Sequence, residues 1–199
     1  MTAPTLRERR SDKRKREILE AALTVMTEDG YSNASMDRIA GAALLTRVGL
    51  YRHFKDKAAL VTALRAYKLL ELSERVKTAV SLETSLEARV TAVIRETFSY
   101  QSQNEGFFRV LFASSFSHEL SADTSLKPFL YAVAAVFEDL PVTSRDLEPI
   151  DCAALLAMLA FGPSIKRAFV PSDSDAGSKP YKAELVARVF LHGILRSSE

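Results

Sequence analysis

Apolar residues recur along this chain at spacings of three and four, which is the repeat of an amphipathic helix. The repeat predicts a first helix over about residues 11–28, and Gly30 follows where a helix-ending glycine is expected. Its inward positions are Leu19, Ala22, Leu23 and Met26. No segment alternates apolar and polar residues for long enough to predict a half-buried strand, so the pattern predicts an all-α fold.

The next part of the chain predicts two short helices and a long one. Ser35 is placed to cap a helix with Asp37 in its first turn, a third helix begins at Thr46, and Asp56 caps a fourth that extends to about Val80. The expected inward positions are Met36, Ile39, Ala40 and Ala43, then Leu50 and Phe54, then Leu60, Leu64 and Tyr67. The first three helices therefore share one small core.

The remainder of the chain predicts further helices, about nine in all. The expected features are a capping box of Thr84 and Glu87, a helix start at Gly106, a helix over Pro128–Asp139 that exits at Pro141, an apolar helix from Pro149 that is interrupted or kinked at Gly162 and Pro163 and ends near Val170, a loop over 171–180, and a last helix over 181–196. The last helix carries more apolar surface than packing on one side can cover.

Composition describes an ordinary globular protein, with 47% hydrophobic and 26% charged residues in 199. The longest apolar run, around residues 153–162, is about half of the roughly 20 residues that cross a bilayer, so no membrane association is expected. The basic opening lacks the apolar core of a secretory signal. A single cysteine, Cys152, excludes an internal disulfide and a thiolate-rich metal site. These features predict a cytoplasmic protein.

Positive charge is concentrated at the N-terminus although the net charge is only +2. The first sixteen residues hold two acidic residues against a basic set of Arg7, Arg9, Arg10, Lys13, Arg14, Lys15 and Arg16. This asymmetry is typical of a nucleic-acid contact, and equally of a solvated leader.

The segment from Gly30 to Leu60 carries the strongest functional signal. Two short helices joined by a tight turn, the second apolar on one side and polar on the other, are a helix-turn-helix. The segment resembles the tetracycline-repressor family in Gly30-Tyr31, Ser35-Met36, Ile39-Ala40, the run Leu50-Tyr51-Arg52-His53-Phe54, Asp56-Lys57 and Leu60. The resemblance covers about forty-five residues including the first helix, and the Leu50 to Phe54 run is its most specific part.

The resemblance implies a role for each residue that faces DNA. Thr46 and Arg47 would meet base edges, with Arg47 taking a guanine through O6 and N7, and Val48 would touch a thymine methyl. Phosphate contacts would come from Tyr51, His53 and Lys57, with Ser35 and Arg38 assisting. The full DNA-binding set is Ser35, Arg38, Thr46, Arg47, Val48, Gly49, Tyr51, Arg52, His53 and Lys57. Tyr51 and His53 could instead pack on the first helix, and Arg38 could be a surface arginine without a role.

Two positions depart from the family pattern. Leu44 stands where the turn usually has glycine, and a left-handed conformation there costs a leucine about 1–2 kcal/mol, so a differently shaped turn is expected. Gly49 lies inside the third helix, which weakens the helix by about 1 kcal/mol while allowing the backbone to approach DNA.

The resemblance also implies a two-domain homodimer. Residues 1–56 would form the DNA-binding domain with its basic arm, and residues 57–199 a helical effector-binding and dimerisation domain. Pairing would use the last two helices, where small residues permit close contact and the apolar excess needs a partner. These small residues are Ala153, Ala157, Ala160 and Gly193. Burial of the helix within one subunit explains part of the same surface.

Ten of the eleven phenylalanines lie after residue 97. The family places an effector pocket there, which implies a small, largely apolar ligand. The candidate effector residues are Phe98, Phe108, Phe112, Phe116, His118, Met158 and Phe161. Polar residues that could orient a ligand, or face solvent, are Arg95, Gln101, Ser114 and His118. Each phenylalanine is also explained as ordinary core, and Met158 and Cys152 are interpreted as core side chains.

The sequence predicts a DNA-binding transcriptional regulator, a repressor released from a palindromic operator by its effector, that requires no cofactor or metal. A constitutive helix-turn-helix dimer without an effector is the first alternative, and an activator is also open. A helical enzyme is the remaining one. His53, His118 and His192 lie far apart, and neither a phosphate-binding loop nor a nucleophile elbow is present.

Overall fold

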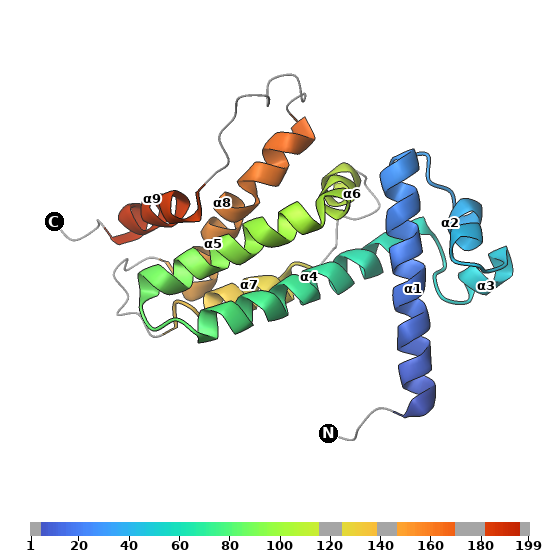
Figure 1. The fold of residues 1–199 in the computed structure, drawn as a ribbon, viewed down its shortest axis with the longest axis horizontal. Coiled ribbons are helices and arrows are strands. Elements are labelled where there is room, and N and C mark those ends of the chain that lie inside the picture. The colour runs from blue at the N-terminus through green and yellow to red at the C-terminus, as the bar shows by residue number, and fades with distance from the viewer. Residues whose placement is uncertain (1–4, 116–124, 139–146, 170–181, 196–199) are drawn as a thin grey trace. The chain divides into compact units, whose positions relative to one another are not determined.

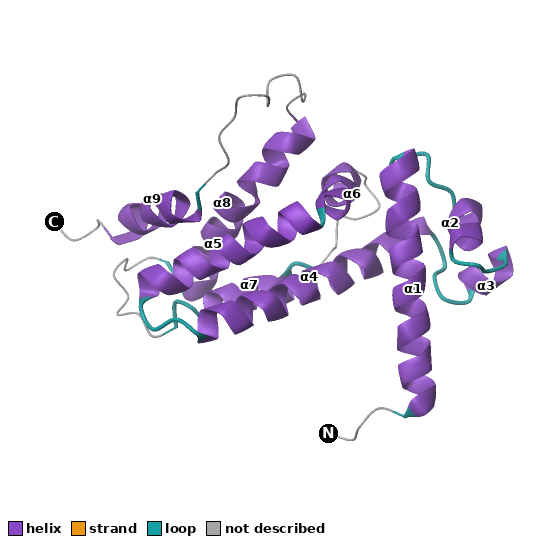
Figure 2. Cartoon of the chain, viewed as in Figure 1, coloured by secondary structure: helices purple, strands orange, loops and turns teal. Residues whose placement is uncertain are grey.

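A computed structural model describes residues 5–115, 125–138, 147–169 and 182–195, and all regular structure within these ranges is α-helical (Figures 1 and 2). The all-α prediction is therefore confirmed for this part of the chain. The helices are α1 (Leu6–Asp29), α2 (Met36–Ala42), α3 (Arg47–Tyr51), α4 (Lys57–Ser81), α5 (Leu86–Gln103), α6 (Glu105–Ser115), α7 (Lys127–Ala134), α8 (Pro149–Phe169) and α9 (Ala183–Leu195).

The N-terminal helix is longer than the pattern predicts. It begins at Leu6 and not near Ser11, so the basic residues from Arg7 to Arg16 belong to a helix. Helix α1 ends at Asp29, and Gly30 adopts φ +81°, the left-handed conformation that confirms its predicted role.

The predicted N-caps of the next helices are mostly confirmed. Asp56 accepts a hydrogen bond from the backbone N–H of Ala59 at 2.7 Å, at the start of α4. The capping box at Thr84 is wrong, because α5 begins one residue later than expected. Ser85 is the cap: its backbone is extended, and its hydroxyl oxygen accepts from the N–H of Ala88 at 3.2 Å. Glu87 then lies in the first turn, where its charge favours the helix dipole.

The later helices depart from the predicted bounds in length. Helix α7 has Pro128 in its first turn, as predicted, but ends at Ala134. Helix α8 runs without interruption from Pro149 to Phe169 with Pro163 inside it, so the predicted interruption is wrong. Helix α9 begins at Ala183. Pro141 and the predicted loop over 171–180 lie outside the described residues.

The chain divides into two compact units. The first comprises residues up to Tyr67 together with the segment from Gly106, and the second comprises Lys68–Glu105 with the segment from Thr124. In the first unit α6 approaches α1 closely, since a Cβ added at Gly106 would lie 2.7 Å from the hydroxyl oxygen of Thr27. Glycine is therefore required where these two helices meet.

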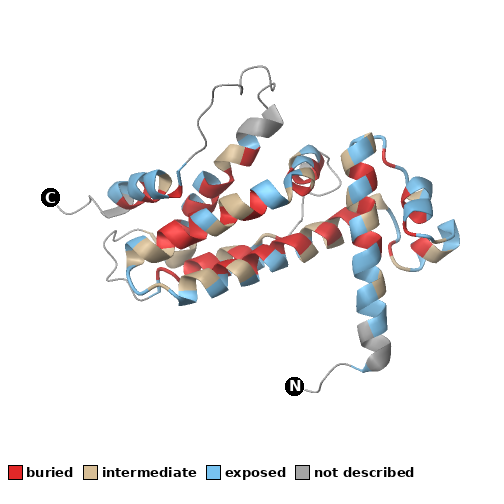
Figure 3. Cartoon of the chain, viewed as in Figure 1, coloured by how far each residue is buried: buried red, intermediate tan, exposed pale blue. Residues whose placement is uncertain are grey.

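Each unit has its own apolar core (Figure 3). The first includes Ile18, Ala22 and Met26 of α1, Ile39 of α2, Leu50 of α3, Leu60 and Leu64 of α4, Phe107 of α6, and Phe54 between α3 and α4. The second includes Leu72 and Val76 of α4, Val93, Ile94 and Tyr100 of α5, Phe129 of α7, Leu156 and Phe161 of α8, and Phe190 of α9. Among the described helices, none has both the length and the apolar character that crossing a membrane requires.

The two residues interpreted as core side chains, Cys152 and Met158, differ in burial. Cys152 is buried in α8, as predicted, and burial raises the pKa of its thiol, which keeps the sulfur protonated and unreactive at neutral pH. The interpretation of Met158 as a core side chain is wrong, because 69% of it is exposed.

Candidate nucleic-acid interface

Helices α2 and α3 form a helix-turn-helix that local hydrogen bonds hold in shape. Ser35 caps α2 by accepting from the N–H of Arg38 at 3.2 Å, and Thr46 caps α3 by accepting from the N–H of Gly49 at 3.1 Å. Leu50 is the buried residue of α3, and its side chain is fully removed from solvent. The five-residue helix α3 is therefore held by one buried leucine and by one hydroxyl cap.

In the turn between α2 and α3, Leu44 adopts φ +54°, which is the left-handed conformation that glycine usually provides at this position. The prediction that the turn has a different shape is therefore wrong. The N–H of Leu44 donates to the carbonyl of Gly41 at 3.0 Å, and the N–H of Leu45 donates to that of Ala40 at 2.9 Å, which is the hydrogen-bond pair of a Schellman motif. The leucine side chain is 89% exposed and gains little from burial to offset its backbone strain.

Helix α3 presents a mixed polar and apolar surface. Val48 is 66% exposed, and Arg47, Tyr51 and Arg52 are exposed beside it. His53 follows directly and is half-buried. The structure thus brings these five predicted DNA-binding residues together on and just after one short helix.

Gly49 has a packing reason inside α3. A Cβ at this position would lie 3.2 Å from the Thr46 hydroxyl oxygen and 3.4 Å from Cδ2 of Leu45. These distances are tighter than an ordinary van der Waals contact, so any side chain would press on the residue that caps the helix. This requirement is independent of any approach to DNA.

Lys57 is engaged inside the first unit. Its ammonium donates to the carbonyls of Tyr31 at 2.9 Å, Ser32 at 3.2 Å and Ala34 at 3.1 Å. The ammonium nitrogen also lies 4.8 Å from the centre of the Tyr31 ring. An ammonium has three protons, and three carbonyls use them. Lys57 therefore holds the loop between α1 and α2, a role that the sequence analysis missed.

Arg38 is bound to acidic residues at the end of α1. It donates to Oδ1 of Asp29 at 3.1 Å and to Oε2 of Glu28 at 3.4 Å, and its Nε donates to the second oxygen of Asp29. The hydrogen bonds that Arg38 donates to Asp29, followed by that carboxylate's charge, raise the pKa of Arg38 above its ordinary value. Ser35, the other phosphate-contact candidate on this side, is exposed at the start of α2.

Arg14 connects α1 to the end of α2. Its guanidinium donates to the carbonyl of Ala43 at 2.9 Å and to the carboxylate of Glu17 at 2.8 Å. The hydrogen bond from Arg14 lowers the pKa of Glu17. Arg14 is therefore tied to the turn, while other basic side chains of the same helix are exposed. These exposed residues are Arg10, Lys13, Lys15 and Arg16.

The predicted effector residues are distributed over both units. Phe108 is buried and Phe112 half-buried on α6 in the first unit, while Phe98 is half-buried and Phe161 buried in the second. The centres of the Phe161 and Phe129 rings lie 5.4 Å apart. Phe116 and His118 lie outside the described residues. Met158 is an exposed surface residue, so its expected place among buried pocket residues is wrong.

Two predicted polar residues lie in the interior, where intramolecular bonds engage them. Gln101 is buried; its Nε2 donates to the carbonyl of Ala160 at 2.7 Å, and the hydroxyl of Ser164 donates to its side-chain oxygen. Ser114 is buried and donates to the carbonyl of Leu111 at 3.0 Å. Arg95 is exposed. Gln101 therefore joins α5 to α8 through hydrogen bonds at both ends of its amide.

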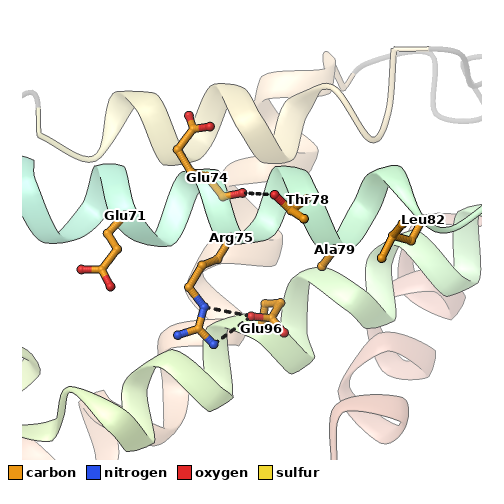
Figure 4. A pocket seen from close by; sticks show the side chains of 7 residues that line it. All are labelled: Glu71, Glu74, Arg75, Thr78, Ala79, Leu82 and Glu96. Atoms are coloured by element: carbon orange, nitrogen blue, oxygen red, sulfur yellow. Dashed lines mark hydrogen bonds and ion pairs between the residues drawn. The ribbon is translucent and has the colours of Figure 1, made fainter.

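An open groove lies in the second unit along α4 and α5 and has a volume of about 520 Å³ (Figure 4). Its lining residues are Glu71, Glu74, Arg75, Thr78, Ala79, Leu82 and Glu96. Arg75 binds Glu96 through Nε at 3.1 Å and through a terminal nitrogen at 3.0 Å, and it donates to Gln103 at 2.7 Å. The described residues contain no group of three metal-ligating side chains close enough to hold an ion.

Helices α8 and α9 each expose an apolar stripe. On α8 the exposed large apolar residues are Leu155, Met158, Leu159 and Ile165, and on α9 they are Leu185 and Val189. Spacings of three, four and seven place each set on one side of its helix. Ala153, Ala157 and Ala160 are buried inside the subunit, so the prediction that these alanines pair with another chain is wrong. Gly193 is exposed on α9.

The geometry defines a helix-turn-helix protein with an additional helical unit, and comparison with known proteins identifies its family. The family model for bacterial regulatory proteins of the tetR family matches residues 18–64, which run from the second half of α1 to the first turns of α4. Residues 18–64 of this chain therefore belong to the tetR family of bacterial regulatory proteins.

One curated relative is also a helix-turn-helix regulator. The chain is 29% identical over 136 residues to the HTH-type transcriptional activator FasR of Mycolicibacterium smegmatis, an alignment that covers 68% of this chain and 61% of FasR. It thus spans less than two thirds of that relative.

Solved structures share the fold over nearly the whole chain. One is a proposed transcriptional regulator from Pseudomonas aeruginosa PAO1, with a TM-score of 0.74 and 17% identity, covering 94% of this chain and 93% of that one. Another is FadR from Bacillus subtilis in complex with stearoyl-CoA, with a TM-score of 0.70 and 16% identity, covering 92% and 99%.

Proposed function

We propose that this chain is a sequence-specific DNA-binding transcriptional regulator that reads an operator with α3. The observation that supports the proposal most strongly is the helix-turn-helix itself. A buried Leu50 anchors α3, and Arg47, Val48 and Tyr51 are exposed on it. A helix that enters a major groove needs this combination of an apolar anchor and outward donors.

The remaining contacts follow from the same placement. Thr46 and Arg47 reach base edges, while Tyr51, Arg52, His53 and Ser35 contact phosphates. Exposed basic residues on α1 add charge attraction to the DNA backbone. Residues 1–56 form the DNA-binding domain in this proposal, and Lys57 and Arg38 support it through the bonds that hold α1, α2 and their loop together. The rest of the chain, 57–199, binds effector and partner.

Dimerisation through α8 and α9 is the second part of the proposal. Both helices expose leucine, methionine or branched apolar side chains on one side, and a soluble protein rarely leaves such a surface uncovered. A second copy of this chain supplies a matching surface by symmetry. Two copies would present two α3 helices to the two half-sites of a palindromic operator.

Regulation by a small, largely apolar effector is the third part. The effector would contact residues from the predicted effector set, namely Phe98, Phe108, Phe112, Phe116, His118 and Phe161. FadR, whose fold this chain shares at 16% identity, binds stearoyl-CoA. The acyl chain of stearoyl-CoA is apolar, and aromatic side chains suit a ligand of this type. Repression, with release when effector binds, is the direction proposed. A constitutive binder would show no change in operator affinity with any ligand.

Selection of bound duplexes from a random pool tests the base-reading role. The wild-type protein should enrich a palindromic consensus, and Arg47→Ala should lose the preference at one or a few base pairs in each half-site. Arg109→Ala is the matched control, because Arg109 is an exposed arginine on α6 of the same unit. Absence of any consensus for the wild-type protein would refute the proposal.

A further inference from the structure

Asp37 lies where a DNA-binding surface would be expected to avoid negative charge. It occupies the first turn of α2, directly before Arg38 and two residues after Ser35. Its side chain is 60% exposed, so burial does not explain it. A carboxylate near DNA phosphates is repelled by them, although the same charge favours the N-terminus of α2. The N-terminal position in α2 explains part of this charge, and the contacts of the carboxylate explain the rest.

The carboxylate contacts the predicted base reader. Oδ2 of Asp37 lies 3.3 Å from a terminal guanidinium nitrogen of Arg47, and these two residues belong to different helices. Neighbouring Arg38 is bound to Asp29 and Glu28 at the end of α1. The contact of Asp37 is thus directed across the turn, from α2 to the first residue of α3.

Arg47 has a second contact, with Tyr51 of its own helix. The central carbon of its guanidinium lies 5.7 Å from the centre of the Tyr51 ring, a cation–π distance. The side chain of Arg47 is 66% exposed and would otherwise sample many rotamers. An exposed ion pair contributes little to folding stability. Holding the guanidinium in one place before DNA arrives lowers the entropy lost on binding, and this affects recognition more than folding.

We propose that Asp37 is a positioning residue that orients the guanidinium of Arg47 for base recognition, with the Tyr51 ring as a second contact. The inference rests on the proposed function, in which Arg47 reads bases. A bidentate contact with guanine requires both the position and the plane of the guanidinium, and the carboxylate restricts both. Asp37 thereby determines specificity without contacting a base.

The experiment compares Asp37→Asn with the wild type in selection from a random duplex pool, followed by titration of selected and scrambled duplexes. Asparagine keeps the shape of the side chain but removes the charge, together with its favourable interaction with the N-terminus of α2. At the base pairs whose preference depends on Arg47, discrimination should fall by about fivefold, part of what a good bidentate contact provides. Affinity for scrambled duplex should rise by about twofold, because one repulsive charge is gone.

Asp12→Asn is the matched control. Asp12 is an exposed acidic residue on α1 of the same unit, so its loss should also raise affinity for scrambled duplex, while the Arg47-dependent preference stays intact. In an Arg47→Ala background, Asp37→Asn should cause no further loss of preference, since the two residues act through one contact. Opposite signs for selected and scrambled DNA distinguish positioning from simple charge removal.

The outcomes separate this inference from the function on which it rests. A wild-type protein without any consensus overturns both. A consensus that Arg47→Ala leaves unchanged overturns the base-reading role of Arg47 and the positioning role of Asp37. A consensus that depends on Arg47 but is unaffected by Asp37→Asn overturns the inference alone.

Discussion

Helices α3 and α8 expose side chains for opposite reasons. Helix α3 has five residues, buries Leu50, and exposes a surface in which arginine and tyrosine accompany one valine. Helix α8 has 21 residues and is apolar both on its buried side and on the exposed side that carries Met158. The first surface is compatible with water and with a charged polymer. The second is compatible with another apolar surface.

The two helices also differ in what holds them. Helix α3 depends on the Thr46 cap, the left-handed turn at Leu44 and one buried leucine, and each of these is a local feature. Helix α8 packs through a long row of buried side chains, and hydrogen bonds to Gln101 join it to α5. The position of α3 therefore depends on a few single residues, whereas the packing of α8 is distributed over many buried side chains.

Removing the anchor of α3 should have the largest effect. Leu50→Ala deletes a fully buried side chain and should destabilise the protein by about 2–5 kcal/mol, measured by denaturant unfolding. Val48→Ala, on the exposed side of the same helix, should change stability by less than about 0.5 kcal/mol. Equal effects for the two variants would show that α3 does not depend on this anchor.

A charge on the exposed side of α8 should break the dimer. Met158→Glu would place a carboxylate in an apolar interface, and we expect the dimer dissociation constant to rise at least about 100-fold, or roughly 2.7 kcal/mol. Sedimentation at several protein concentrations measures it. Leu82→Glu, at an equally exposed leucine outside α8 and α9, is the control. A dimer that survives the first change would disprove the proposed interface.

Loss of the Lys57 ammonium should loosen the loop between α1 and α2. Lys57→Met removes three bonds to carbonyls and should destabilise the protein by about 2–3 kcal/mol in denaturant unfolding. Lys55→Met, at an exposed neighbour, should have little effect. Unchanged stability, together with a slope of log affinity against log salt that is shallower by about 0.9, would instead show a direct phosphate contact by Lys57.

The smallest change should be a gain in stability. Leu44→Gly removes the strain of a leucine at φ +54° and loses almost no buried surface, so stability should rise by up to about 1 kcal/mol, partly offset by the greater freedom of an unfolded glycine. Leu44→Ala keeps the strain and should leave stability nearly unchanged. The melting temperatures of both variants measure this, and a less stable glycine variant would refute the strain.

The sequence predicts the DNA-binding region better than it predicts the rest, because the signals there are local. Ser35 and Asp56 each cap a helix through a bond to a backbone N–H three residues ahead, as residue type and spacing predict. Thr46 caps α3 in the same way, whereas the sequence analysis has the helix begin at Thr46 itself. Leu50 and Phe54 follow from their spacing of four. The bonds of Lys57 to carbonyls 23 to 26 residues away left no such local signal.

The C-terminal helices show the limit of a periodic pattern. Both sides of α8 are apolar, so the pattern could not determine whether Ala157 or Met158 faces the core, and the chosen alanines are buried. The cap of α5 was misplaced by one residue because Thr84 and Ser85 have interchangeable hydroxyls. Arg75 and its partners on α5 were missed because they meet only after α4 and α5 pack.

The most direct test of base reading by α3 is the affinity ratio between a selected duplex and its scrambled counterpart, measured by titration at one fixed salt concentration. We predict a ratio of at least about 1,000 for the wild-type protein and a marked decrease for Arg47→Ala. A wild-type ratio near one would contradict the account.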